Sequence, residues 1–204
     1  MNKKIRVGVF GGTFNPPHIA HVNAAESFFR EMRLDKLLII PDYLPPHKEL
    51  SGNVTAEERL HMCSLAFSHI DGVEISDMEI KRGGRSYTVH TLEELSCEDV
   101  ELYLLIGTDM LLTLDTWYMP ERIFALAAVC YVRRESDERL SDEILHKCEE
   151  YKTRFGAKIF PVKCEVIELS STELRNQIKE KPNTLQMLPD AVGKYVSERK
   201  LYND

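Results

Sequence analysis

Residues 5–21 of the chain read IRVGVFGGTFNPPHIAH, and this stretch indicates the type of fold. Residues 5–10 are mostly apolar and lead into Gly11 and Gly12, which is typical of a buried strand that ends in a glycine-rich turn. From about position 18 to position 33, apolar residues recur at helical spacing. A strand, a turn and a helix in this order predict the first unit of a parallel α/β sheet.

The rest of the chain continues this alternation. We expect further strands at residues 36–41, 73–76, 100–106, 127–132, 157–160 and 166–169. We expect helices at about 55–69, 89–95 and 140–155, and others after Asp109, from Ser170 and after Pro189. The chain is therefore predicted to have an α/β fold with a doubly wound, mainly parallel sheet of the Rossmann-like type. No repeat or long linker divides its 204 residues, so we expect a single domain over residues 1–204.

Composition excludes several classes of protein. With 43% hydrophobic and 29% charged residues, the chain is too apolar to be disordered. Its net charge of -7 weighs against a nucleic-acid coat or a membrane-surface protein, so we expect neither partner. The five cysteines are scattered without CxxC spacing, which favours reduced thiols. Because the sequence also lacks a long apolar segment and a signal peptide, we expect a cytoplasmic protein.

The first chemical motif joins Gly11 and Gly12 to a pair of histidines. Ligands of open α/β sheets bind beyond the carboxyl ends of the strands, where glycines allow a close approach of the backbone. His18 and His21 would share one face at the positive end of the following helix, where they could contact phosphate. The alternative is a turn with two incidental surface histidines. A metal site is less favoured, because helical zinc pairs usually lie four residues apart and no acidic third ligand is evident.

The second motif is SSTELR, at residues 170–175. The hydroxyls of Ser170, Ser171 and Thr172 and a helix start could cradle phosphate oxygens, and Arg175 could add a charged fork. The alternative is an ordinary helix cap, for which serine and threonine are common residues.

Together the two motifs resemble the nucleotidyltransferase superfamily known for its HxGH and ISSTxxR sequences, and within it the bacterial nicotinate mononucleotide adenylyltransferase family. Supporting segments are PDYLPPHK at 41–48, SYTVHTL at 86–92 and IGTDM at 106–110, with Trp117. The resemblance covers nearly the whole chain in the same order. The chain departs from the family pattern at Asn15, usually acidic, at Ala20, usually glycine, and at His90, usually aspartate.

This resemblance implies adenylyl transfer from ATP to nicotinate mononucleotide, which yields nicotinate adenine dinucleotide (deamido-NAD) and pyrophosphate in NAD biosynthesis. Mg²⁺ would be bound through the ATP phosphates, without a protein cage. It implies His18, His21 and Arg175 as the catalytic residues. It also implies ATP contacts by Gly11, Gly12, Thr13, Phe14, Lys48, Asp109, Ser170, Ser171 and Thr172. Asn15, Thr88, Trp117 and Tyr118 would contact the mononucleotide.

Other interpretations stay open at this point. Asp109 could be a helix N-cap, Trp117 could be packed in the core, and Arg133 with Arg134 could be either a phosphate contact or an exposed basic pair. A sister transferase that acts on phosphopantetheine is the nearest enzymatic alternative. A nucleotide sensor without turnover, suggested by Asn15, is another class. The sequence leaves open a homo-oligomer and the preference between nicotinate and nicotinamide mononucleotide.

Overall fold

A parallel sheet forms the centre of the molecule. The computed structural model describes residues 3–46, 54–133, 140–180 and 182–202. Within these ranges the sheet has six strands in the order β3-β2-β1-β4-β5-β6, and every neighbouring pair is parallel. The strands are β1 (Ile5–Gly12), β2 (Lys36–Pro41), β3 (Val73–Ile75), β4 (Val100–Gly107), β5 (Ala127–Val132) and β6 (Ile159–Pro161). The predicted doubly wound parallel α/β fold is thus confirmed.

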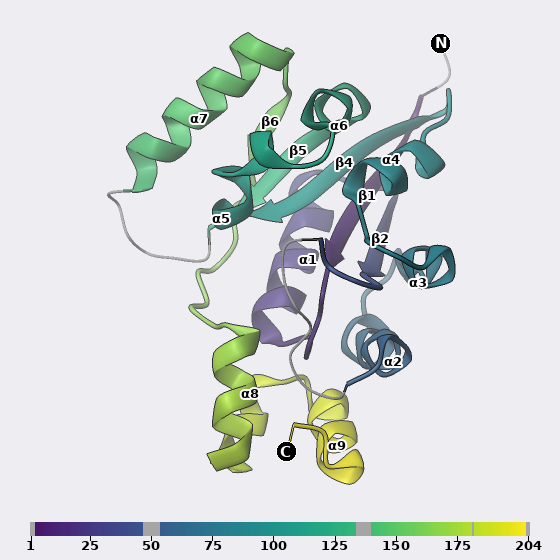
Figure 1. The fold of residues 1–204 in the computed structure, drawn as a ribbon, viewed down its shortest axis with the longest axis vertical. Coiled ribbons are helices and arrows are strands. Elements are labelled where there is room, and N and C mark those ends of the chain that lie inside the picture. The colour runs from purple at the N-terminus through teal and green to yellow at the C-terminus, as the bar shows by residue number, and fades with distance from the viewer. Residues whose placement is uncertain (1–2, 47–53, 134–139, 181, 203–204) are drawn as a thin grey trace.

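Helices cover both faces of the sheet (Figure 1). The α-helices are α1 (Ile19–Glu31), α2 (Ala56–Phe67), α3 (Met78–Arg82), α4 (Thr88–Leu95), α5 (Thr108–Leu111), α6 (Pro120–Leu126), α7 (Leu140–Phe155), α8 (Ser171–Glu180) and α9 (Asp190–Arg199). Two 3-10 helices are η1 (Leu114–Thr116) and η2 (Pro182–Met187). One apolar core contains side chains of α1, α2, α8 and α9, and a second core on the opposite face contains side chains of α4 to α7.

Side chains of each strand alternate between these two cores. Ile39 belongs to the core with α1 and Ile40 to the core with α4, and both are fully buried. Gly8 explains the close approach of α1 to β1. A Cβ atom at Gly8 would lie 2.4 Å from Leu34 Cδ1 and 2.9 Å from Phe28 Cε1, so a larger residue would force these packed side chains to move.

The ends of two predicted helices follow the expected chemistry. At the start of α2, the backbone N–H of Glu58 donates to Thr55 Oγ1 at 3.2 Å, and Thr55 N–H donates to Glu58 Oε2 at 2.9 Å. This is the predicted capping box. Gly156 follows α7 with a φ of 65°, a left-handed conformation that favours glycine at this position.

The strand predicted at residues 166–169 was wrong, because this segment has no strand beside it. It lies beyond β6, the edge of the sheet, and Val166 is exposed. A side chain holds the segment instead: Asn23 Nδ2 donates to the Glu165 carbonyl at 2.8 Å. Gly11 and Gly12 were also predicted to form a turn, whereas they belong to β1 and pair with Ile40 and Pro41 of β2.

The strand order places a crevice beside the ends of β1 and β4. From β1 the chain continues to β2 on one side, whereas β4 continues to β5 on the other side. In doubly wound sheets this switch point is where ligands bind, outside the carboxyl ends of the strands. Gly12 and Gly107 end their strands here. None of the helices in the described ranges is both long and apolar enough to cross a membrane.

Candidate active site

A cleft of about 800 Å³ opens at this switch point and contains both sequence motifs. Its volume lies within the range of small-molecule sites. The predicted site residues that line it are Gly11, Gly12, Thr13, Phe14, Asn15, His18, His21, Thr88, Asp109, Trp117, Tyr118, Ser170, Ser171, Thr172 and Arg175. Lys48 lies outside the described residues. The expected convergence of the two motifs is confirmed, whereas the role of each residue stays a prediction.

Direct hydrogen bonds join the two motifs. Arg175 Nη1 donates to the Asn15 carbonyl at 2.8 Å, and Ser171 Oγ donates to the Pro16 carbonyl at 3.1 Å. Arg175 Nη2 also donates to Thr172 Oγ1 at 3.1 Å. Ser170 does act as a cap, because its Oγ accepts the Thr172 N–H at 3.2 Å. Capping therefore explains Ser170, but Ser171 and Arg175 reach across to the loop after β1.

The two histidines form a closely spaced pair at the start of α1. His18 is the N-cap, His21 lies in the first turn, and their ring centroids are 3.7 Å apart. The backbone N–H of His18 donates to His21 Nδ1 at 3.2 Å. When the His21 ring is neutral, its proton therefore lies on Nε2. Two imidazoles at the positive end of a 13-residue helix can stabilise phosphate charge.

Phe14 supports this pair from the protein interior. Its ring is buried and packs edge-on against His21 with a centroid distance of 5.1 Å. Its backbone has a φ of 47°, which is uncommon for a residue with a bulky side chain. Such strain often accompanies functional loops. The Phe14 ring therefore orients His21, and we expect the backbone of Phe14, rather than its ring, to face a nucleotide.

A buried arginine, which the sequence interpretation missed, holds the loop after β1. Arg59 of α2 is fully buried; its Nη1 donates to the Thr13 carbonyl at 2.8 Å and to Asp42 Oδ1 at 3.0 Å. Thr13 Oγ1 in turn donates to Asp42 Oδ2 at 2.8 Å. The signal was available: Arg59 shares a helical face with Met62 and Cys63, both fully buried. A charge within an apolar stripe indicates a buried partner.

Asn15 is fixed by a residue far along the chain. It is buried, and its Oδ1 accepts a 2.7 Å hydrogen bond from the Tyr202 hydroxyl. Burial raises the pKa of Tyr202, so the phenol keeps its proton and acts as the donor. A carboxylate at position 15 would present the same acceptor oxygen. The departure from the family pattern at Asn15 therefore preserves this contact.

The other end of the cleft is aromatic. The Tyr118 ring lies 4.8 Å from the Tyr87 ring and 5.8 Å from that of His90. Trp117 packs against the core with α4 and also lines the cleft, so core packing describes only part of its environment. Thr88 begins α4 at the same end. Flat side chains and a helix start suit a flat ring with a polar substituent.

Asp109 lies on the short helix after β4. The alternative that it caps this helix was wrong, because Gly107 is the N-cap and Asp109 lies within the first turn of α5. An N-cap is an extended residue before the helix, and here that residue is Gly107, the last of β4, because α5 begins at Thr108. Asp109 is exposed and lines the cleft.

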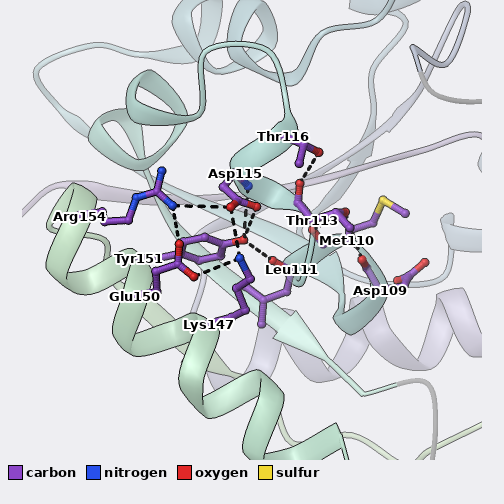
Figure 2. A network of polar contacts seen from close by, with 10 residues as sticks. All are labelled: Asp109, Met110, Leu111, Thr113, Asp115, Thr116, Lys147, Glu150, Tyr151 and Arg154. Carbon is purple, nitrogen blue, oxygen red and sulfur yellow. Dashed lines mark hydrogen bonds and ion pairs between the residues drawn. The ribbon is translucent and has the colours of Figure 1, made fainter.

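A polar network anchors the segment from Asp109 to Thr116 (Figure 2). Asp115 accepts hydrogen bonds from Lys147 Nζ at 3.2 Å and from the Tyr151 hydroxyl at 3.0 Å, both on α7. The Tyr151 hydroxyl also lies 3.0 Å from the Leu111 carbonyl oxygen. Helix α7 thus contacts α5 at Leu111 and η1 at Asp115, which lies two residues before Trp117.

This network predicts a pH-dependent contribution to stability. Burial raises the pKa of Asp115, but hydrogen bonds from Lys147 and Tyr151 outweigh it and lower the pKa overall. A carboxyl with a lowered pKa in the folded state stabilises the fold above its unfolded pKa, about 4. We expect Asp115→Asn to lower the free energy of unfolding by about 2 kcal/mol at pH 7.

The difference should shrink as the pH falls below about 4, through the lowered pKa of Asp115, because the wild-type carboxyl then takes up a proton. Urea unfolding at pH 7 and at low pH measures both values. Asp71→Asn, at an exposed turn, is the matched control. An Asp115→Asn deficit that stays constant with pH would contradict this account.

Known proteins resemble the chain over almost its full length. Residues 9–177 match the family model described as cytidylyltransferase-like. A Listeria monocytogenes protein, described as a probable nicotinate-nucleotide adenylyltransferase, is 35% identical over 201 residues and covers 98% of both chains. One from Lachnoclostridium phytofermentans with the same description is 36% identical over 199 residues, covering 97% of this chain and 98% of that protein.

Solved structures share the fold at lower identity. The Plasmodium falciparum nicotinic acid mononucleotide adenylyltransferase complexed with APC has a TM-score of 0.74 at 18% identity, with 98% of both chains covered. Its complex with NaAD has a TM-score of 0.75 at 16% identity, with the same coverage. These likenesses show that the chain has their fold.

Proposed function

Because the chain belongs to the cytidylyltransferase-like family and to the nicotinate-nucleotide adenylyltransferases, we propose that it transfers AMP from ATP to nicotinate mononucleotide. The products are nicotinate adenine dinucleotide and pyrophosphate, and the reaction belongs to NAD biosynthesis. The observation that carries the proposal is that the two motifs meet in one cleft. Arg175 donates a hydrogen bond to the Asn15 carbonyl, and the His18 and His21 pair lines the same cleft. We further propose that residues 1–204 act as one domain in this reaction.

The transfer needs no nucleophile from the protein. An oxygen of the mononucleotide phosphate attacks the α-phosphorus of ATP in line, and the bond between that phosphorus and the bridging oxygen to the β-phosphorus breaks. The electron pair leaves with pyrophosphate. The protein supplies positioning and charge stabilisation, which account for most of the catalysis in such reactions.

The polar end of the cleft suits the triphosphate. His21 and His18 would contact the α-phosphate region, and Arg175 with Ser171 and Thr172 would stabilise the departing pyrophosphate. Gly11, Gly12, Thr13, Phe14 and Ser170 would complete the ATP contacts, with Asp109 at a ribose hydroxyl. Lys48 would add positive charge. All of these except Lys48 line the described cleft.

The aromatic end suits the pyridine ring. Trp117 and Tyr118 would stack on it, and Thr88 would donate to its carboxylate at the start of α4. Asn15, which follows Phe14 in the loop after β1, would contact the mononucleotide, while Tyr202 holds its side chain.

Mg²⁺ fits this proposal as an ion that ATP brings with it. Among the described residues no group of three or more His, Cys, Asp or Glu side chains could hold a metal ion. The donor set therefore suits an ion held by phosphate oxygens and water, with the cleft enclosing the complex. When bound, the ion would neutralise phosphate charge.

A reaction mixture tests the proposed function directly. We expect the purified protein with ATP, Mg²⁺ and nicotinate mononucleotide to release pyrophosphate and to form the dinucleotide in equal amounts. Coupled pyrophosphate detection and chromatography measure the two products. Parallel mixtures with nicotinamide mononucleotide and with phosphopantetheine give the substrate preference.

Other outcomes of this experiment would contradict the proposal. Product from phosphopantetheine alone would identify the sister transferase. Binding of ATP and nicotinate mononucleotide without any product, in the presence of Mg²⁺, would identify a sensor. The intact His18, His21 and Arg175 cluster favours turnover.

A further inference from the structure

A buried carboxyl group lies beside the aromatic end of the cleft, and the mechanism above does not use it. Glu79 of α3 is only 7% exposed, yet it lines the cleft. Its Oε1 accepts a hydrogen bond of 2.5 Å from Thr91 Oγ1, and the Ser86 hydroxyl also hydrogen-bonds to the carboxyl group. Thr91 and Ser86 are themselves buried.

These two hydroxyls flank Thr88 along the chain. Ser86 precedes it by two residues, and Thr91 follows it by three, within the first turns of α4. The carboxyl group of Glu79 therefore forms hydrogen bonds to residues before and after the segment that carries Tyr87 and Thr88. A shift of the Glu79 side chain would therefore disturb the start of α4.

The contacts continue on both sides of Glu79. Ser86 Oγ accepts the Tyr43 N–H at 2.9 Å, which links the segment to the loop after β2. Thr91 Oγ1 accepts from Arg82 Nη1 at 3.1 Å, and Arg82 Nη2 pairs with Glu94 at 2.6 Å. Thr91 therefore accepts one hydrogen bond and donates the other, to Glu79. This order fixes the direction of its hydroxyl proton.

Burying a carboxyl group has a cost that an apolar side chain would avoid. Burial raises the pKa of Glu79, which shows that its ionised form is disfavoured there. Fold stability alone gives no reason for such a group in a cavity wall. A role in substrate binding does give a reason for a buried carboxyl group. Its hydrogen bonds can hold a residue that contacts the substrate within the narrow range of positions that binding requires.

We propose that Glu79 is a positioning residue for the mononucleotide: through Ser86 and Thr91 it fixes Tyr87 and Thr88 at the aromatic end of the cleft. This inference rests on the proposed function, which assigns that end to the pyridine ring. Arg59 and Asp42 hold the phosphate end through Thr13, and this network meets that of Glu79 at Tyr43, whose N–H donates to Ser86 and whose carbonyl accepts from Arg59. Loss of Glu79 leaves the contacts to Thr13 in place, so it should affect one substrate more than the other.

Steady-state kinetics with each substrate varied in turn test the proposal. We expect Glu79→Ala to raise the KM for nicotinate mononucleotide by about tenfold or more, as for other residues that orient a contact residue. The KM for ATP should change by less than about twofold, because the phosphate contacts stay intact. Calorimetric titration with nicotinate mononucleotide alone should show the same loss of affinity.

Conservative variants separate positioning from general damage. Glu79→Gln keeps the shape and one acceptor oxygen, so it should restore most of the mononucleotide affinity. Thr91→Val removes one donor hydroxyl at constant volume and should raise the same KM, even if Glu79→Ala does not fold. Glu98→Ala, at an exposed position outside the cleft, is the control that should leave both KM values unchanged.

The results distinguish this inference from the proposed function. A wild-type protein that makes no dinucleotide contradicts the proposed function. An active wild type contradicts the positioning role alone if Glu79→Ala and Thr91→Val leave the mononucleotide KM unchanged. The same holds if these variants raise both KM values equally, or if Glu79→Gln is as impaired as Glu79→Ala.

Discussion

Replacing His21 by alanine is expected to lower turnover by about two orders of magnitude or more. The His21 ring lies at the positive end of α1, 3.7 Å from the His18 ring and packed against Phe14. With Nδ1 occupied by the His18 N–H, its Nε2 is the proton-bearing nitrogen that can stabilise developing charge on a phosphate. Alanine removes this donor and leaves the backbone contacts of the helix start in place.

Initial rates of pyrophosphate release at saturating ATP and nicotinate mononucleotide measure the effect. The KM values should change much less than kcat, because the lost interaction is strongest in the transition state. His146→Ala, at an exposed position of α7, is the matched control and should retain normal turnover. Near-normal turnover of His21→Ala would remove this residue from the mechanism.

The second large effect concerns stability. We expect Arg59→Met to lower the free energy of unfolding by about 3–5 kcal/mol, because it leaves the carboxylate of Asp42 without its buried cation. The substitution also removes the donors to the Thr13 and Tyr43 carbonyl oxygens. Urea unfolding monitored by circular dichroism gives the value.

Two further variants test the cause. Adding Asp42→Asn to Arg59→Met removes the unpaired charge, so the double variant should recover part of the lost stability. Arg122→Met is the matched control, because Arg122 pairs with Glu93 at 2.9 Å but lies half exposed. Its effect should stay below about 1 kcal/mol. Equal losses for Arg59→Met and Arg122→Met would show that burial of the pair is not decisive.

Most of the sheet could be predicted from local pattern, because its central strands are buried on both faces. Strands β2 and β5 begin and end where the sequence placed them, since each is a short apolar run bounded by polar or helical residues. The failed strand at 166–169 was also partly apolar, but its Ile167 and Leu169 line a small cavity beside the histidine pair, and Leu169 also packs against the core with α1 without belonging to the sheet. An apolar pattern shows that a side chain is covered, but not by what.

The candidate site was predictable as far as its motifs were contiguous. Glycines, histidines and the 170–175 segment each carry a local pattern, and the parallel topology brings them to one edge. The contacts of Tyr202 with Asn15 and of Glu79 with Thr91 join residues that no local pattern relates. Their partners depend on packing between separate elements, which one sequence does not reveal. Helix α3 was missed because its five residues are too few to display a periodic pattern.

The bonds that join Asn15 to Arg175 and Tyr202 also have a consequence during protein synthesis. A nascent chain that has exposed only β1 to β5 outside the ribosome already contains the histidine pair, but it lacks Arg175 and Tyr202, which hydrogen-bond to Asn15. The proposed nucleotide site is completed only after the stretch beyond β6 has emerged and docked. We therefore expect incomplete polypeptides that end before this stretch to bind ATP more weakly than the full chain.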